Sequence, residues 1–183
     1  PRGGLIVCKK DHAKGIDQSV FPGLQGGPHM NQVAATAVTL KLAAEQPFKT
    51  YAAQVLKNAK ALAAALMEQG ASLVTGGTDN HLMVIDVVKS FGINGTIAEK
   101  ALDHAGITTN KQVIPDDPNP PLRPSGVRLG TPAATTRGMK EGEMKQIARI
   151  MIEAMKNHED AKRLEGLRQE TRVLCSRFPV PGL

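Results

Sequence analysis

Apolar side chains recur along the chain with two spacings, and each spacing predicts a kind of element. From residue 29 to about 46, and again over residues 48–69, they return every three or four positions, which is typical of helices with a buried face. Pro47 separates the two stretches, so either one helix kinks there or a second helix begins. Gly70 follows the second stretch and is a natural helix end.

Short apolar runs elsewhere predict strands. Residues 5–8 are four apolar side chains in a row, and the other strand candidates are residues 72–75, 81–88, 107–114 and 126–129. Residues 9–15 predict a polar turn, and residues 17–28 a glycine-rich loop. Residues 115–124 carry five prolines, so we expect an irregular connector there.

Three helices are expected in the second half of the chain. The sequence TIAE at residues 96–99 matches a capping box, which predicts a helix running to about residue 105. Residues 140–158 place apolar side chains on one face of an amphipathic helix, and a last helix is expected over residues 160–177. The chain therefore predicts an α/β fold: residues 1–47 end one domain, and residues 48–183 form a small domain with mixed strands and helices.

Composition narrows the class of protein. Hydrophobic residues make up 41% of the 183 residues, with no Trp and one Tyr, so we expect an aliphatic core. The net charge of +6 allows an anionic partner, but basic residues are spread out and aromatic side chains are scarce, which argues against nucleic-acid binding as the main role. No apolar run reaches membrane-spanning length. Two distant cysteines indicate reduced thiols in a cytoplasmic protein, and no metal-ligand spacing is present.

The sequence FPGLQGGPH at residues 21–29 is the first candidate for chemistry. Three glycines precede a helix-forming stretch, so free N–H groups and a helix dipole can together attract a phosphate. The motif lacks the endings of a P-loop and of a dinucleotide-binding fingerprint. A tight connector that uses glycine only for its backbone freedom is the alternative.

Arg128 is the second candidate. It stands between Val127 and Leu129 on an expected strand, so alternation places it on the face opposite those two residues. Its fork suits bidentate capture of a carboxylate, although an ordinary surface Arg on a half-exposed strand is the alternative. The sequence GTDNH at residues 77–81 reads as a turn, and His81 alone does not indicate catalysis.

Taken together, these segments resemble serine hydroxymethyltransferase, also called glycine hydroxymethyltransferase. The motifs VFPG and QGGP (residues 20–28), GTDNH (77–81), SGVR (125–128) and GTPA (130–133) occur in the family's order and spacing. The resemblance covers the family's C-terminal part. It implies the end of the large domain of a fold-type I pyridoxal-phosphate enzyme, followed by a small domain with a mainly antiparallel sheet packed against helices.

The resemblance also implies a chemistry and its residues. The family transfers the hydroxymethyl carbon of serine to tetrahydrofolate, giving glycine, with pyridoxal 5′-phosphate as electron sink. Arg128 matches the arginine that binds the substrate carboxylate. Gly26 and Gly27 match the pair that reaches the cofactor phosphate of the neighbouring subunit in a homodimer or higher oligomer. Phe21 and Gln112 match positions near the folate, although the family usually has Asn where this chain has Gln112.

The start of the chain has its own implication. In the family, the Schiff-base lysine lies a few residues before the sequence PRGG that begins here, and Arg2 belongs to the segment just after it. We therefore interpret the chain as part of a longer protein and expect the 183 residues alone to be inactive. An autonomous, non-catalytic C-terminal domain acting as a folding or interaction module is the alternative, and a basic RNA-binding module is a further one.

Overall fold

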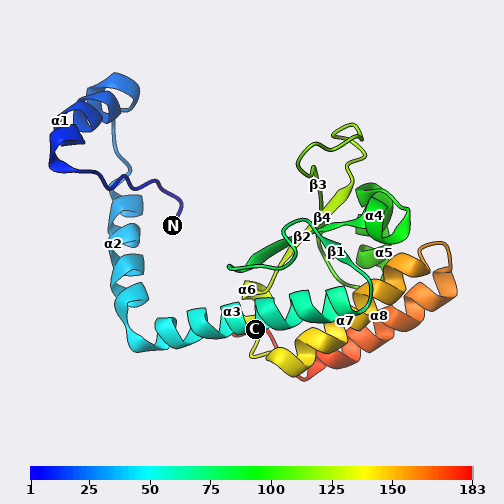
Figure 1. Ribbon diagram of the computed structural model, residues 1–183. Helices are drawn as coiled ribbons and strands as arrows, with labels where there is room; N and C mark the ends of the chain where they lie inside the picture. The colour runs from blue at the N-terminus through cyan, green and yellow to red at the C-terminus, as the bar shows by residue number, and fades with distance from the viewer. Residues whose placement is uncertain (183) are drawn as a thin grey trace. The chain divides into compact units, whose positions relative to one another are not determined.

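The computed structural model describes residues 1–182 and divides into two compact units, Pro1–Thr50 and Tyr51–Leu183 (Figure 1). We refer to them as unit 1 and unit 2 and describe each by itself. One helix, α3 (Gln46–Glu68), begins in unit 1 and continues into unit 2. The division falls close to the expected boundary at residue 47, but the family's domain boundary itself stays a prediction.

Unit 1 consists of helices without a core of its own. It contains α1 (Lys10–Gln18), the π-helical segment η1 (Ser19–Leu24), α2 (Met30–Ala44) and the first turn of α3, and none of its described side chains is buried. Three sequence predictions are wrong here, the third of them in part. Residues 5–8 form no strand, because unit 1 offers no second strand to pair with. Residues 9–15 are not a turn, since most of them belong to α1. The loop expected over residues 17–28 is confined to its last residues, because residues 17–24 belong to α1 and η1.

The break at Pro47 is the start of a second helix rather than a kink. The helix α2 ends at Ala44, Glu45 has an extended backbone, and α3 begins at Gln46. Pro47 therefore stands in the first turn of α3, where the missing N–H costs no helical hydrogen bond. Further along, α3 buries one face, and Gly70 follows it with a φ of 93°, as expected for a helix end.

Unit 2 contains a four-stranded antiparallel sheet in the order β1-β2-β4-β3. The strands are β1 (Ser72–Leu73), β2 (Leu82–Asp86), β3 (Asn110–Gln112) and β4 (Gly126–Gly130). This small antiparallel sheet among helices confirms the predicted fold class. The first three strands are shorter than their apolar runs, because residues at the run ends leave the ladder for turns and helices, whereas β4 extends one residue beyond the expected range.

Five further helices surround the sheet: α4 (Val87–Phe91), α5 (Gly95–His104), α6 (Pro132–Thr136), α7 (Glu141–Lys156) and α8 (Ala161–Ser176). The two shortest, α4 and α6, were not expected. The predicted capping box at residues 96–99 is wrong, because the N-cap of α5 is Asn94, whose side chain accepts hydrogen bonds from the N–H groups of Thr96 and Ile97. Glu99 instead accepts hydrogen bonds from Lys111 on β3.

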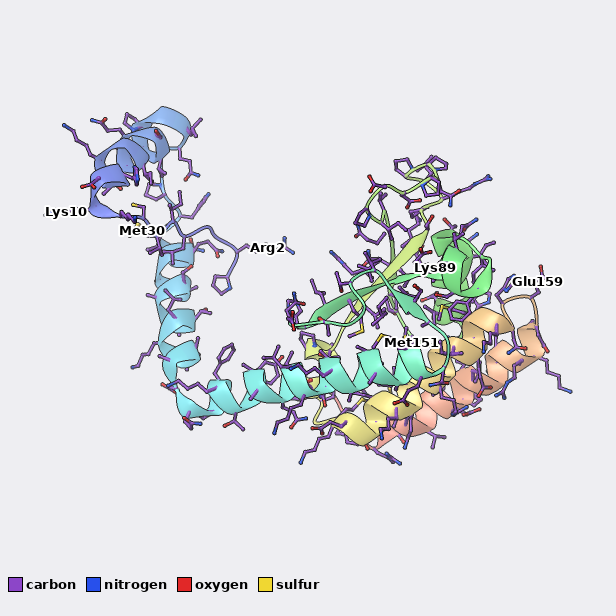
Figure 2. The ribbon with its side chains drawn as sticks, viewed as in Figure 1. Arg2, Lys10, Met30, Lys89, Met151 and Glu159 are labelled. Atoms are coloured by element: carbon purple, nitrogen blue, oxygen red, sulfur yellow. The ribbon has the colours of Figure 1, made fainter. Side chains whose placement is uncertain are left out.

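The core lies between one face of the sheet and the helices α3, α5, α7 and α8 (Figure 1). It is aliphatic and rich in Met, as the composition predicts. Met151 of α7 is only 1% exposed, whereas Met30 of α2 in unit 1 is 64% exposed (Figure 2). The largest fully buried side chains of the sheet and helices include Leu66, Ile85, Leu102, Met144, Met155 and Leu167.

A buried polar residue joins α3 to the segment after β4. Asn58 is completely buried, and its amide nitrogen donates to Thr135 Oγ1 at 2.8 Å and to the Met139 carbonyl at 2.9 Å. Thr131 reinforces this link by donating to the Val55 carbonyl at 3.0 Å. These bonds fix the end of β4, and with it the strand that carries Arg128, against the helical layer.

Candidate functional site

A cleft of about 690 Å³ opens on the face of the sheet that points away from the helical core. Its walls are the connection between β1 and β2, the middle of β2, and Pro115 of the proline-rich connector. Among the described residues that line the cleft, two are charged, Arg128 of β4 and Asp79 of the connection. The cleft therefore places a cation beside a loop of small and polar residues.

Arg128 has the orientation predicted from the sequence. Its neighbours Val127 and Leu129 are 0% and 8% exposed and face the core, while Arg128 itself is exposed on the opposite face. Its Nε donates to Asn110 Oδ1 at 3.2 Å, across the pair that joins β3 to β4. The terminal nitrogens of the fork form no hydrogen bond or ion pair within residues 1–182, so they can receive a carboxylate.

The loop between β1 and β2 forms a fixed wall of the cleft. Gly76 and Gly77 have φ values of 65° and 151°, which side-chain-bearing residues rarely adopt. The Thr78 hydroxyl donates to the Leu82 carbonyl at 2.6 Å, and Asn80 Oδ1 accepts from the Leu82 N–H at 2.7 Å. The turn predicted from GTDNH is therefore confirmed, and its polar side chains hold the loop itself.

Gln112 lies on β3, on the same side of the sheet as Asn110 and therefore as Arg128. It is half-buried, and its amide nitrogen donates to the Val113 carbonyl at 3.2 Å. Its backbone pairs with Gly126 at the opposite end of the β3–β4 ladder from Arg128. The structure thus brings Gln112 and Arg128 onto one surface of the sheet, but Gln112 does not line the cleft.

Asp117 organises the proline-rich connector and was not identified from the sequence. Its carboxylate accepts hydrogen bonds from the Ser125 hydroxyl at 2.6 Å and from the N–H groups of Ser125, Asn119 and Ile114 at 2.9 to 3.2 Å. Burial raises the pKa of Asp117, but these hydrogen bonds outweigh burial and lower the pKa to about 2. An Asp followed by prolines is a turn signal that could have indicated this role.

The other candidates stand in unit 1. Gly26 and Gly27 follow η1, and Gly27 has a φ of 54°. The N–H groups of both form no hydrogen bond within the described residues, and a Cβ built at either position meets no atom within 4 Å. Phe21 is 62% exposed, and Arg2 is also exposed. The loop thus offers open backbone donors to an anion, which fits a phosphate.

Residues 1–182 contain no group of three or more His, Cys, Asp or Glu side chains that could hold a metal ion. No helix in this range has both the length and the apolar character needed to cross a bilayer.

Comparison with known proteins decides the family. The family model for serine hydroxymethyltransferase matches residues 1–151. The chain belongs to the serine hydroxymethyltransferase family. A curated serine hydroxymethyltransferase of Acidobacterium capsulatum is 52% identical over 182 residues, covering 100% of this chain and 42% of that protein. The chain therefore spans less than half the length of this relative, and Arg128, Gly26 and Gly27 lie within the range that the family model matches.

Proposed function

We propose that the complete protein interconverts serine and glycine and transfers the one-carbon unit to tetrahydrofolate. Membership of the serine hydroxymethyltransferase family supports this activity, together with one observation in the structure. Arg128 presents a guanidinium fork with free terminal nitrogens in a cleft, on a strand whose other side chains face the core. Serine and glycine share a carboxylate, which is the group such a fork recognises.

Arg128 has the role of binding and orienting the substrate carboxylate. Its Nε is held by Asn110, so the fork has lost part of its rotational freedom before substrate arrives. The Gly76–Asn80 part of the cleft wall is fixed by its own hydrogen bonds, and Asp117 fixes the connector that contributes Pro115. These three supports keep the cleft in shape while the substrate exchanges.

Replacement of Arg128 tests this role in the complete protein. Arg128→Lys keeps the charge but loses the fork, so we expect serine affinity to fall by at least about tenfold. For comparison, removing one partner of a desolvated charge pair altogether costs roughly 2–5 kcal/mol of binding free energy. The control is Arg172→Lys on α8, where the side chain is exposed and makes no ion pair within the described residues. Unchanged serine affinity in Arg128→Lys would contradict the role.

The family's cofactor is pyridoxal 5′-phosphate, which when bound stabilises negative charge developing on the substrate's Cα. We propose that Gly26 and Gly27 hold its phosphate, because their N–H groups have no other acceptor within residues 1–182. We also propose that they do so for the neighbouring subunit of a homodimer or higher oligomer. Family membership supports this second step. Phe21 and Gln112 are proposed to lie near the folate.

Mixing two inactive variants tests whether the loop acts across subunits. One complete protein carries Gly26→Pro and Gly27→Pro, and the other lacks the family's cofactor-attaching lysine. If the loop acts across the interface, one site in each mixed dimer is intact, so activity returns to about half the normal value per mixed dimer. If the loop serves its own subunit, activity stays absent after subunit exchange has been demonstrated by mass spectrometry.

The 183 residues on their own are proposed to lack this activity, because the family's lysine is not among them. A role as a non-catalytic folding or interaction module remains the second candidate, and unit 2 favours it by containing a core of its own. Serine cleavage measured for the 183-residue chain tests the first statement, and turnover by this chain alone would contradict it.

A further inference from the structure

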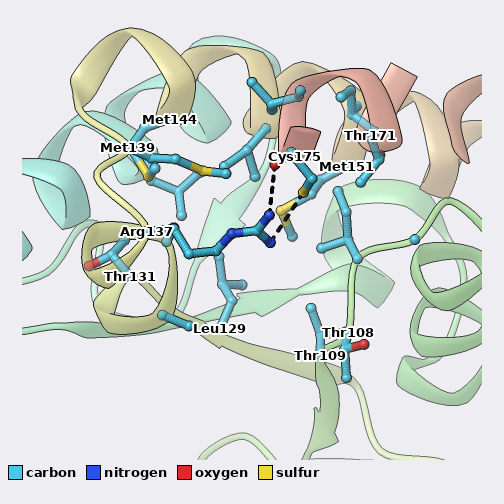
Figure 3. Close-up of a pocket in the computed structure, with 18 of the residues that line it drawn as sticks. Thr108, Thr109, Leu129, Thr131, Arg137, Met139, Met144, Met151, Thr171 and Cys175 are labelled. Carbon is cyan, nitrogen blue, oxygen red and sulfur yellow. Dashed lines mark hydrogen bonds between the residues drawn. The ribbon is translucent and has the colours of Figure 1, made fainter. Parts of the chain in front are cut away.

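A second cavity, of about 340 Å³, lies on the other side of β4 from Arg128 (Figure 3). Leu129 of β4 contributes to its wall, together with residues from α6, α7, α8 and the loop before β3. The exposed residues Thr108 and Ala133 line it too, so the cavity reaches the protein surface. Its volume lies in the range of pockets that hold small organic molecules.

The walls are mostly apolar and adaptable. Met139, Met144 and Met151 line the cavity and are 1% to 3% exposed. Methionine side chains are unbranched and polarisable, so they can adjust to the shape of an apolar guest. A pocket with such walls favours a flexible aliphatic or aromatic body over a polar one.

One charged side chain enters this apolar space. Figure 3 shows the guanidinium of Arg137 directed toward Cys175. Its Nε donates to the Phe178 carbonyl at 2.7 Å, and its terminal nitrogens donate to the Cys175 carbonyl at 2.8 Å and approach Cys175 Sγ at 3.4 Å. No Asp or Glu is among the described residues that line the cavity, so the charge of Arg137 has no counter-ion there.

A hydroxyl on the wall also lacks a partner. Thr109 lines the cavity, and its Oγ1 is buried without a hydrogen bond within the described residues. A buried hydroxyl left unpaired costs about 1–3 kcal/mol, so such groups in folded proteins usually have a partner. A bound molecule with a polar end supplies one.

Support for the end of α8 accounts for only part of this arrangement. Arg137 binds carbonyls at the C-terminus of that helix, where a cation is favourable. Together with the contact to Cys175 Sγ, that role uses three of the five N–H groups and leaves two. It explains neither the cavity beside the guanidinium nor the unpaired hydroxyl of Thr109.

We propose that this cavity binds a small monocarboxylic acid with an apolar body of about eight carbons. Its carboxylate accepts hydrogen bonds both from the remaining N–H groups of Arg137 and from the hydroxyl of Thr109, and its apolar chain lies against the three methionines. The site is distinct from the Arg128 cleft and does not depend on the activity proposed for it.

Methionine-methyl NMR of the full 183-residue chain tests the proposal, with octanoate as the probe and 1-octanol as its uncharged counterpart. Octanoate is expected to shift the resonances of Met139, Met144 and Met151 in a saturable way. Its affinity should be at least about tenfold higher than that of 1-octanol, because the alcohol cannot form the charged hydrogen bond. The exposed Met30 and Met67 are internal controls. Absence of saturation, equal shifts at the controls, or equal affinity for both probes would overturn the proposal.

Thr109→Val provides a second readout, in which stability and binding change in opposite directions. The variant removes an unpaired buried hydroxyl, so its melting temperature is expected to rise, while octanoate affinity falls about three- to tenfold. Thr39→Val on the exposed side of α2 is the matched control and should change neither quantity appreciably. Octanoate affinity unchanged by Thr109→Val would contradict the assigned contact.

Discussion

Unit 1 and unit 2 use apolar side chains in contrasting ways. In unit 1, apolar residues on and around α2 are about half exposed or more, among them Val33, Val38 and Leu40. In unit 2, apolar residues with the same helical spacing on α3 and α7 are buried against a sheet. Both patterns produce helices, but only in unit 2 does the chain supply the surface that covers the apolar face.

The contrast separates local from tertiary determinants of structure. A helix satisfies its backbone hydrogen bonds internally, so α2 can form where nothing packs on it, whereas a strand needs a neighbour. Residues 5–8 are as apolar as the strands of unit 2 but have no such neighbour among the described residues. We propose that further parts of the complete protein, or a second subunit, cover unit 1.

Hydrogen exchange of the 183-residue chain should show the largest difference between the units. Amides of the core strands and of α7 are expected to exchange roughly a thousandfold or more slowly than those of α2, because only the former require global unfolding to open. Mass spectrometry of peptides from each unit measures this difference. Residues 1–30 as the most protected region would contradict the comparison.

Two Leu→Ala substitutions, one in each unit, compare how much buried packing contributes to the free energy of unfolding. Leu66 of α3 is 0% exposed, so Leu66→Ala should lower the free energy of unfolding by about 2–5 kcal/mol. Leu40 of α2 is 52% exposed, so Leu40→Ala should change it by less than about 0.5 kcal/mol. Urea unfolding followed by circular dichroism gives both values, and equal losses would show that unit 1 is packed after all.

A smaller, pH-dependent effect is expected from Asp117 in unit 2. Its folded pKa of about 2 lies below the ordinary value of 3.8, so the ionised form stabilises the folded state. That contribution is complete above about pH 5, well above the unfolded value, and is lost as the pH falls toward 2. The difference in unfolding free energy between the wild type and Asp117→Asn should therefore shrink between pH 5 and pH 2. A difference independent of pH would contradict this.

The sequence predicted what depends on local pattern. Helical spacing gave α2, α3, α7 and α8, and alternation gave the outward face of Arg128 on β4. The helix α1, the short helices α4 and α6 and the true cap of α5 were missed. In α4 and α6 a single turn is set by tertiary contacts rather than by periodicity.

The candidate site was predicted only in part, for a related reason. Arg128 stands out because a charged residue interrupts an apolar strand. The supports given by Asn110 and Asp117 join residues 18 and 8 positions apart, and no local spacing marks such pairs. The pairing of Arg137 with the end of α8, 38 positions away, is likewise visible only once the chain has folded.

The most direct test of the central claim compares serine with serinamide, which lacks the carboxylate, in the complete protein and in its Arg128→Lys variant. If the fork of Arg128 binds the substrate carboxylate, the wild type should prefer serine by at least about tenfold, and the variant should lose most of that preference. Calorimetric titration of both ligands gives the four affinities. A variant that binds both ligands more weakly but keeps the wild-type preference would contradict the assignment of Arg128.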